Sequence, residues 1–478
     1  MLYQELVGKH LSVEYIVLSD MVEVLTYSEL DARVRETVKQ IREFGVEAGM
    51  RVLIRNENTI RTVTEILACI SMHVCFILTP EKITDEQLDY IIKDSQAFLL
   101  IDHKGAGRKQ PYRKLLDSPL PKVNELVYIL YTSGSTGRPK GVMASCSQVM
   151  FCTQAINERL HNDMEDRILC VLPLSFDYGL YQLFMALRYE AKLILPRNIM
   201  MQQIPRLLKQ ERVTAFPAMP ALLNMILKTG LLQRVTLPDL RYISSTGDAL
   251  SVKLIQRLHD LFPHTFIFPM YGLTECKRAA IMPEGQWDKV WEGSCGVPLT
   301  GTEVYLEHAT EDGVGELVVR GPNVMEGYWN ADGAEDAFFE DEEGRKCLRT
   351  GDYFRIDKDG FLYFVSRKKR ILKTNGYRIG CAELETYLFE RLETLAEEVR
   401  VVGIPSEMVG DDIVVCIHGR GDIERLREQV SKAVLGLPQY QRPHHLYYTK
   451  EAFPLNVNGK IDDDVIRRNI KKNELYGI

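Results

Sequence analysis

A loop rich in glycine and hydroxyl residues, directly behind an apolar run, constrains this chain most strongly. The stretch 131–142 reads Tyr-Thr-Ser-Gly-Ser-Thr-Gly-Arg-Pro-Lys-Gly-Val, and the apolar run 126–131 that leads into it predicts a buried strand. Gly134 and Gly137 permit turns that present backbone N–H groups to anionic oxygens, and Lys140 adds a positive charge. Hydroxyl side chains supply further donors at Thr132, Ser133, Ser135 and Thr136. The sequence therefore predicts a loop that binds a polyphosphate.

This loop is not a Walker A motif. A Walker A loop needs lysine directly after glycine and a serine or threonine directly after lysine. Here Lys140 follows Pro139 and precedes Gly141. The plain alternative is a mobile Gly/Ser surface linker. Proline and lysine at fixed offsets behind a strand favour a phosphate loop of another kind.

The first two thirds of the chain alternate strand-like and helix-like segments. Thr26-Tyr-Ser-Glu29 is typical of a capping box, and apolar residues follow it at spacings of three and four up to Gly45. Short apolar runs predict buried strands at 51–54, 98–101, 168–172 and 192–195. We expect an α/β fold in which βα units surround largely parallel sheets.

The pattern changes near residue 295. Segments 303–308 and 315–321, around the turn Asp312-Gly313, predict antiparallel strands and a β-rich subdomain over about 295–366. The charged stretch 367–370 then separates an N-terminal core, 1–366, from a small α+β domain, 367–478. In that small domain we expect strands near 399–404 and 412–418 and a helix near 422–435.

Composition excludes several function classes. A net charge of −7 argues against nucleic acid as a partner. The sequence has no run of 18 apolar residues, and its first residues lack the pattern of a signal peptide, so we expect no membrane partner and a cytoplasmic location. Ten cysteines without a C-x-x-C pair predict reduced thiols and no zinc site.

The loop resembles the signature loop of the adenylate-forming enzymes, the superfamily of acyl-CoA synthetases, peptide-synthetase adenylation domains and luciferases. Four later segments match motifs of the same superfamily in the same order, over nearly the whole chain. They are Tyr271-Gly-Leu-Thr-Glu275, Thr350-Gly-Asp352, Arg367 and Asn458-Gly-Lys460. The resemblance implies an AMP-forming ligase that uses ATP and Mg²⁺.

The resemblance also implies how ATP is held. Tyr271 would stack near adenine, Thr274 would contact phosphate and Glu275 would hold magnesium, since a hydroxyl and a carboxylate so close in sequence can reach the same phosphate chain. Asp352 would accept both ribose hydroxyls, with Arg367 reinforcing it. The same resemblance adds two glycines to the ATP site, Gly247 and Gly272.

Catalysis must bring together two anions, because a carboxylate oxygen attacks the α-phosphorus of ATP. The resemblance implies that Lys460 bridges the two, assisted by Lys140, Thr274 and Glu275. The C-terminal domain would then rotate about a hinge at Lys369 and open a tunnel for a thiol. Gly376-Tyr-Arg378 resembles the element that faces the reaction centre in that second pose, although 380–385 departs from the usual sequences.

The segment 174–182 decides which acid is activated. Peptide-synthetase adenylation domains carry Phe-Asp here, and the resemblance implies that Asp177 pairs with the α-ammonium of an amino acid. Fatty and aryl acyl-CoA synthetases commonly have histidine where this chain has Phe176. The plain alternative for Asp177 is an N-cap or turn carboxylate.

Arg278 complicates the amino-acid interpretation, because it occupies a selectivity position of the family. It could pair with Asp177, bind an acidic group of the substrate, or point outward. The resemblance places further residues in the pocket, namely Tyr178, Tyr181, Thr246 and Met270. Because the two tyrosines would narrow this pocket, we expect a small substrate, best an amino acid such as proline.

We expect the acceptor to be a phosphopantetheine thiol. No carrier-protein segment follows Ile478, so the sequence predicts a stand-alone enzyme that loads a separate carrier protein or free CoA. The alternative within the same fold is a CoA ligase for small carboxylic acids. A catalytically dead nucleotide-binding protein is disfavoured because the catalytic positions are all retained, and nothing specifically supports luciferase chemistry.

Overall fold

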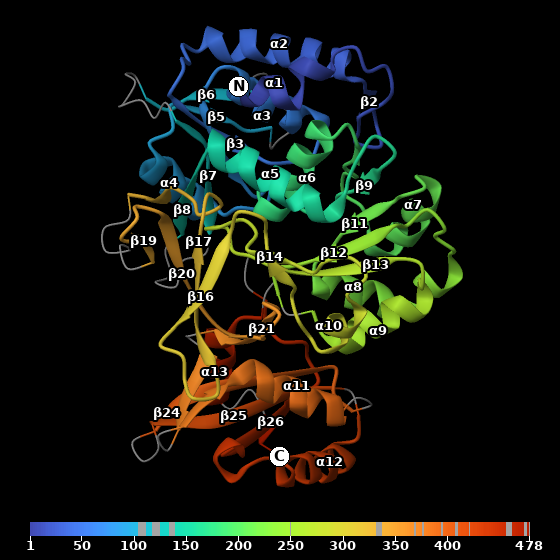
Figure 1. Ribbon diagram of the computed structural model, residues 1–478, viewed down its shortest axis with the longest axis vertical. Helices are drawn as coiled ribbons and strands as arrows, with labels where there is room; N and C mark the ends of the chain where they lie inside the picture. Colours follow the sequence, from blue (N-terminus) through green and yellow to red (C-terminus); the bar gives the residue numbers. More distant parts are fainter. Residues whose placement is uncertain are drawn as a thin grey trace. The chain divides into compact units, whose positions relative to one another are not determined.

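The chain divides into two compact units. The first contains Met1–Tyr305, Val318–Arg349 and Asp357–Leu362, and the second contains Leu306–Leu317, Thr350–Ile356 and Tyr363–Ile478. The structure is a computed structural model (Figure 1). It describes residues 1–103, 111–116, 125–132, 139–248, 250–330, 337–367, 370–374, 377–392, 395–406, 410–419, 421–455, 461–472 and 476–477.

The largest sheet lies in the first unit. In the described ranges its strand order is β15-β14-β13-β12-β11-β9-β10-β1-β2, and Figure 1 shows β11, β12 and β13 side by side. The strands from β13 to β1 run parallel, whereas β14, β15 and β2 pair antiparallel at the two ends. The bounds are β1 (Leu18–Ser19), β2 (Val24–Leu25), β9 (Arg167–Leu169), β10 (Lys192–Ile194), β11 (Ala215–Pro217), β12 (Tyr242–Ser245), β13 (Phe266–Tyr271), β14 (Ala280–Ile281) and β15 (Val297–Pro298).

A second sheet of the same unit has the order β18-β8-β7-β4-β3-β5-β6 within the described residues. Its parallel centre, β7-β4-β3-β5, is flanked by strands that pair antiparallel. The bounds are β3 (Arg51–Arg55), β4 (Cys75–Thr79), β5 (Leu99–Ile101), β6 (Tyr112–Lys114), β7 (Leu126–Thr132), β8 (Lys140–Ser145) and β18 (Gly327–Trp329). The prediction of largely parallel sheets in an α/β fold is confirmed.

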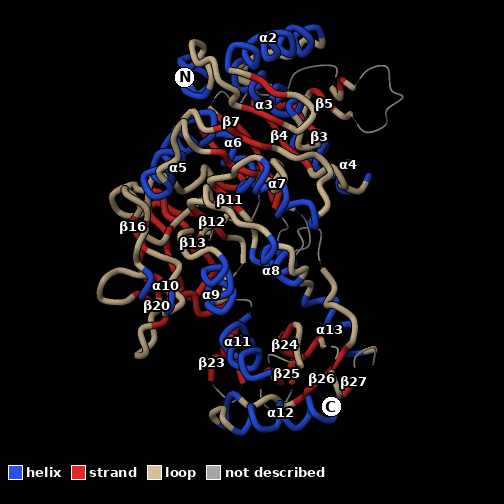
Figure 2. Tube along the Cα trace, turned by 90° about the vertical axis from the view of Figure 1, so that its right-hand side faces the viewer, coloured by secondary structure: helices blue, strands red, loops and turns tan. Residues whose placement is uncertain are grey.

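Helices connect these strands. Thr26 caps α2 by the predicted box, because its side chain accepts from the Glu29 backbone and Glu29 reaches back to the Thr26 backbone. Figure 2 shows α2 beside α3, and α3 next to the strands of the second sheet. The bounds in the first unit are α1 (Leu2–Leu6), α2 (Tyr27–Glu43), α3 (Ile60–Ser71), α4 (Asp85–Ser95), α5 (Cys146–Leu160), α6 (Asp177–Arg188), α7 (Ile204–Gln210), α8 (Pro220–Lys228), α9 (Val252–Leu261) and α10 (Trp287–Trp291).

The expected β-rich segment forms a further sheet. Its described strands are ordered β16-β17-β20-β19, with β21 paired to β20. The expected turn is present, since Thr310 N donates to Val314 O at 2.9 Å, Gly313 N donates to Thr310 O at 2.9 Å, and Gly313 has φ +73°. The bounds are β16 (Glu303–Glu307), β17 (Val314–Arg320), β19 (Phe338–Glu340), β20 (Lys346–Ile356) and β21 (Leu362–Arg367).

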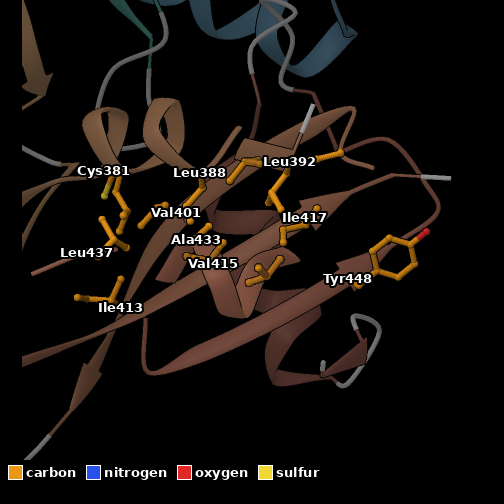
Figure 3. Close-up of a cluster of buried hydrophobic side chains, with 14 of the residues drawn as sticks. Cys381, Leu388, Leu392, Val401, Ile413, Val415, Ile417, Ala433, Leu437 and Tyr448 are labelled. Atoms are coloured by element: carbon orange, nitrogen blue, oxygen red, sulfur yellow. The ribbon is translucent and has the colours of Figure 1, made fainter. Parts of the chain in front are cut away.

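The C-terminal part of the second unit has its own sheet and core. Buried side chains of α11, α12 and the strands β24 to β26 form one hydrophobic cluster (Figure 3). The two strands and the helix expected here are confirmed as β24, β25 and α12. The bounds are β22 (Ile371–Thr374), β23 (Tyr377–Gly380), α11 (Cys381–Leu392), β24 (Glu398–Ser406), β25 (Gly410–His418), α12 (Ile423–Leu435), β26 (His445–Thr449), α13 (Asp463–Lys471) and β27 (Tyr476–Gly477).

The expected hinge, Lys369, lies outside the described residues, so the boundary at 366/367 stays a prediction. Across the described ranges, no helix is both long and apolar enough to span a membrane.

Candidate active site

Several expected site residues follow the carboxyl ends of neighbouring parallel strands. The strands β12 and β13 pair in register, with Ser245 opposite Pro269, so their ends lie at one edge of the sheet. In open α/β sheets this edge is where ligands bind. Thr246 and Gly247 follow β12, and Gly247 has φ +91°, a conformation that favours glycine. Met270, within β13, is buried.

The phosphate-loop lysine and the Glu275 carboxylate meet at one tyrosine. Tyr328 on β18 lies opposite Val142 on β8, the strand that begins at Lys140. The Tyr328 hydroxyl donates to Glu275 Oε1 at 2.7 Å, and Lys140 Nζ lies 5.0 Å from the centroid of its ring. Burial and Glu275 raise the pKa of Tyr328 well above its ordinary value, so the phenol remains a donor.

Sequence reasoning missed Tyr328. Its neighbours fix it from both sides, since Met325 N donates to Glu275 O at 2.9 Å and Glu326 N donates to Met143 O at 3.0 Å. The pattern around residue 328 carries no motif, and its importance comes from a strand pairing between distant segments.

The loop itself is described only at its two ends. Thr132 and Lys140 are opposite one another where β7 and β8 pair, and Thr132 Oγ1 donates to Lys140 O at 3.5 Å. Outside the described residues lie Ser133, Gly134, Ser135, Thr136, Gly137 and Lys460. Their roles stay predictions.

The pair expected at the ribose is formed within the second unit. Arg367 Nε donates to Asp352 Oδ1 at 3.0 Å, and Asp352 is buried. Thr350 holds the turn before it, because its hydroxyl donates to Leu317 O at 2.7 Å and accepts from Asp352 N at 3.2 Å. In the first unit, Tyr271 is buried, while Thr274 and Glu275 are partly exposed.

Asp177 is paired with a lysine that sequence reasoning did not single out. Lys277 Nζ donates to Asp177 Oδ2 at 2.8 Å and to Asp177 O at 2.9 Å, and both residues are buried. Burial lowers the pKa of Lys277 to about 8, against the opposing effect of the Asp177 carboxylate. The N-cap alternative for Asp177 is wrong, because the cap of α6 is Phe176. The pairing of Arg278 with Asp177 is also wrong, because Lys277 occupies that position.

The two tyrosines expected in the pocket enclose the Lys277 ammonium. Its Nζ lies 4.4 Å from the ring centroid of Tyr181 and 5.8 Å from that of Tyr178. The Tyr178 hydroxyl donates to Ser244 O at 2.8 Å, and Tyr128 donates to the Tyr181 hydroxyl at 3.3 Å. Carboxylate and aromatic faces together form a cage for an ammonium group.

Arg278 points inward. Its side chain is 3% exposed, so the outward orientation is wrong, and its guanidinium carbon lies 5.0 Å from the ring centroid of Tyr178. Within the described part of the chain, its buried Nε has no hydrogen-bond partner and its guanidinium forms no ion pair.

Gly272 lies close to the backbone of the turn that carries the two cations, Lys277 and Arg278. A Cβ at Gly272 would lie 2.4 Å from Lys277 O and 2.9 Å from Arg278 Cα. Ala279 N donates to Tyr271 O at 3.0 Å, which holds the turn against the end of β13. The glycine of the Tyr-Gly-Leu-Thr-Glu motif therefore lets the chain bring residues 277 and 278 to this edge.

Three comparisons with known proteins bear on this arrangement. The family model described as AMP-binding enzyme matches residues 9–329. Bacitracin synthase 2 of Bacillus licheniformis is 28% identical over 467 residues, which cover 92% of this chain and 17% of that protein. The L-proline--[L-prolyl-carrier protein] ligase of Pseudomonas fluorescens is 27% identical over 494 residues, which cover 95% of each chain. The chain thus spans less than a fifth of the first relative and nearly all of the second.

A solved structure shares the fold. The o-succinylbenzoate CoA synthetase (MenE) of Bacillus subtilis, in complex with the acyl-adenylate intermediate OSB-AMP, superposes with a TM-score of 0.80 at 24% identity. The superposition covers 98% of this chain and 97% of that chain.

Proposed function

This chain belongs to the AMP-binding enzyme family, and we propose that it activates a small carboxylic acid with ATP and transfers the acyl group to a phosphopantetheine thiol. In the first step a carboxylate oxygen bonds to the α-phosphorus, and the bond to the departing pyrophosphate breaks. In the second step the thiol sulfur bonds to the carbonyl carbon, its proton is lost, and AMP leaves with the carboxylate oxygen.

The meeting of Lys140 and Glu275 at Tyr328 carries this proposal. A cation beside a carboxylate that is held by a phenol suits a magnesium-bound triphosphate, because Lys140 would offset phosphate charge and Glu275 would bind the magnesium ion. Among the described residues no cluster of three or more His, Cys, Asp or Glu side chains could hold a metal alone. Proteins bind Mg²⁺ through one or two carboxylates together with substrate phosphates, so Glu275 and the phosphates of ATP would suffice as its ligands.

Each remaining group has a place in the same reaction. When bound, Mg²⁺ neutralises the phosphates, and Glu275 would hold it. Lys140 would attract the β- and γ-phosphates, and the Asp352 carboxylate would accept the ribose hydroxyls beside Arg367. Lys460 would bridge the two reacting anions and then withdraw as the C-terminal domain turns about Lys369.

Two substrate classes fit this reaction. An amino acid loaded on a separate carrier protein is supported by the position of Asp177 and by the likeness to the proline carrier-protein ligase over 95% of each chain. A small acid without an amine, transferred to CoA, is favoured by one specific observation. The Asp177 carboxylate, which would receive the substrate ammonium, already receives the ammonium of Lys277.

Exchange of pyrophosphate into ATP tests the reaction. The purified protein should show exchange that depends on one member of a panel of amino acids and small acids. Lys460→Ala should lose most of this exchange and still bind ATP. The acceptor is then identified by incubation with CoA or with a phosphopantetheinylated carrier protein. No exchange with any acid, while ATP still binds, would indicate a nucleotide-binding protein without ligase activity.

A further inference from the structure

We propose that the acid activated by this enzyme carries a second carboxylate, which forms an ion pair with the Arg278 guanidinium. This inference rests on the proposed function, because it assigns the substrate class of the same site. It makes Arg278 a residue that determines specificity.

The charges of the buried cluster carry the inference. Asp177 contributes one negative charge, and the Lys277 ammonium balances it at 2.8 Å. Arg278 then adds a positive charge that no described carboxylate balances, although the residue is only 3% exposed. Buried charges in proteins are normally paired, and guanidinium is the side chain that best matches a planar carboxylate.

Arg278 lies beside residues that are expected to line the acid pocket. Its guanidinium lies against the Tyr178 ring, and the Phe176 ring lies 6.4 Å from that ring. Phe176 in turn approaches Gly247, where an added Cβ would lie 3.8 Å from its Cζ atom. The ring that Arg278 contacts is itself anchored near the carboxyl end of β12, where the Tyr178 hydroxyl donates to Ser244 O at 2.8 Å.

The local backbone gives the two cations different partners. The contact of Gly272 with Lys277 O holds the turn, and Lys277 itself has φ +56°. The Lys277 ammonium donates a hydrogen bond to the Asp177 carboxylate, while the Arg278 guanidinium lies against the Tyr178 ring. A neutral amino acid would bring an ammonium to this cluster and increase its positive charge. A second carboxylate would neutralise it.

Matched acids that differ only in the second carboxylate provide the test. The pairs are succinate with succinamate, glutarate with glutaramate, and aspartate with asparagine, each measured as kcat/KM in ATP–pyrophosphate exchange. We expect the preferred dicarboxylate to exceed its monoamide by about a hundredfold or more, because a site built for a charged group rejects the analogue that lacks it. The third pair shows whether an amine is accepted beside the second carboxylate.

Arg278→Gln should reduce the ratio between diacid and monoamide to near one, through a raised KM for the diacid. Arg278→Lys should restore part of the ratio. Arg212→Gln, at an exposed arginine paired with Asp239, is the control and should keep the ratio. Unchanged ATP binding by Arg278→Gln confirms that the variant is folded.

Equal activity with diacid and monoamide would overturn the inference and leave the proposed function intact. Equal loss for both acids in Arg278→Gln would also overturn it, because the guanidinium would then hold the reacting carboxylate. Absence of exchange with every acid would overturn the proposed function and the inference with it.

Discussion

Lys277 donates to the Asp177 carboxylate at 2.8 Å inside a cage of two tyrosine rings. The carboxylate that would receive the ammonium of an amino-acid substrate is thus already paired within this chain. The charge of the acid, and in particular the group that pairs with Arg278, therefore decides which substrate the site accepts.

Breaking that pair should destabilise the first unit. Lys277→Met leaves the Asp177 charge buried without a partner, and we expect a loss of about 3–5 kcal/mol in the free energy of unfolding. The double variant with Asp177→Leu should lose less, because it removes both charges. The three tryptophans, Trp287, Trp291 and Trp329, lie in the first unit, so their fluorescence in a urea titration reports on it.

The control for this prediction is the exposed pair between Arg212 and Asp239. Breaking it with Asp239→Asn should change stability little, because exposed ion pairs are screened by solvent. Equal stability of the native protein and Lys277→Met would show that the buried pair does not form.

Tyr328→Phe should weaken the response of the enzyme to magnesium. The variant keeps the ring beside Lys140 and loses the hydrogen bond to Glu275, which for a charged acceptor contributes about 1.5–3 kcal/mol. Tyr328 is a positioning residue, so the informative readout is the Mg²⁺ concentration that gives half-maximal exchange, and we expect it to rise about tenfold or more. Tyr112→Phe, which loses only a hydrogen bond to Gln40, should behave like the native protein. The same Mg²⁺ dependence in both variants would contradict the role given to Tyr328.

Gly272→Ala should disturb the turn that carries Lys277 and Arg278. The new Cβ would lie 2.4 Å from backbone oxygen, so the turn must shift, and we expect both a loss of stability and a lower kcat/KM for the acid. Gly285→Ala is the matched control, because its Cβ meets nothing within 4 Å and its only strain comes from φ +81°. Equal losses of stability and equal losses of kcat/KM in the two variants would contradict this prediction.

Asp352→Asn should weaken nucleotide binding. The buried carboxylate is held by Arg367 at 3.0 Å, and its replacement by an amide removes the negative charge and one acceptor oxygen from the group proposed to bind the ribose hydroxyls. Titration calorimetry should show a Kd for ATP raised about tenfold or more, the size expected for a lost charged hydrogen bond. Asp359→Asn, at an exposed carboxylate, should bind ATP normally. Normal binding by both variants would place the ribose elsewhere.

Local signals in the sequence predicted the elements well. The capping box at Thr26 marks the start of α2, and the apolar runs at 51–54 and 126–131 mark β3 and β7, because burial and capping are decided by neighbouring residues. Two strands and a helix near the C-terminus, β24, β25 and α12, were also predictable, because the apolar residues of each recur at the spacing of its own element.

The decisive contacts of the site could not be predicted from local signals. Tyr328 reaches Glu275 only because β18 pairs with β8 in one register, and no pattern near residue 328 encodes that pairing. Which of the adjacent residues Lys277 and Arg278 pairs with Asp177 depends on the conformation of the turn that carries them, in which Lys277 has φ +56°. The Tyr-Gly-Leu-Thr-Glu motif indicated where the two cations lie in the sequence, but it did not indicate which groups they pair with.

The transfer of labelled oxygen from the acid to AMP tests the central claim most directly. The acid that supports exchange is supplied with ¹⁸O in its carboxylate, together with ATP and the thiol acceptor, and the AMP is analysed by mass spectrometry. An acyl-adenylate intermediate predicts AMP that carries one ¹⁸O atom, because the carboxylate oxygen stays on phosphorus when the thiol attacks the carbonyl. Unlabelled AMP, or ADP as the nucleotide product, would contradict the account.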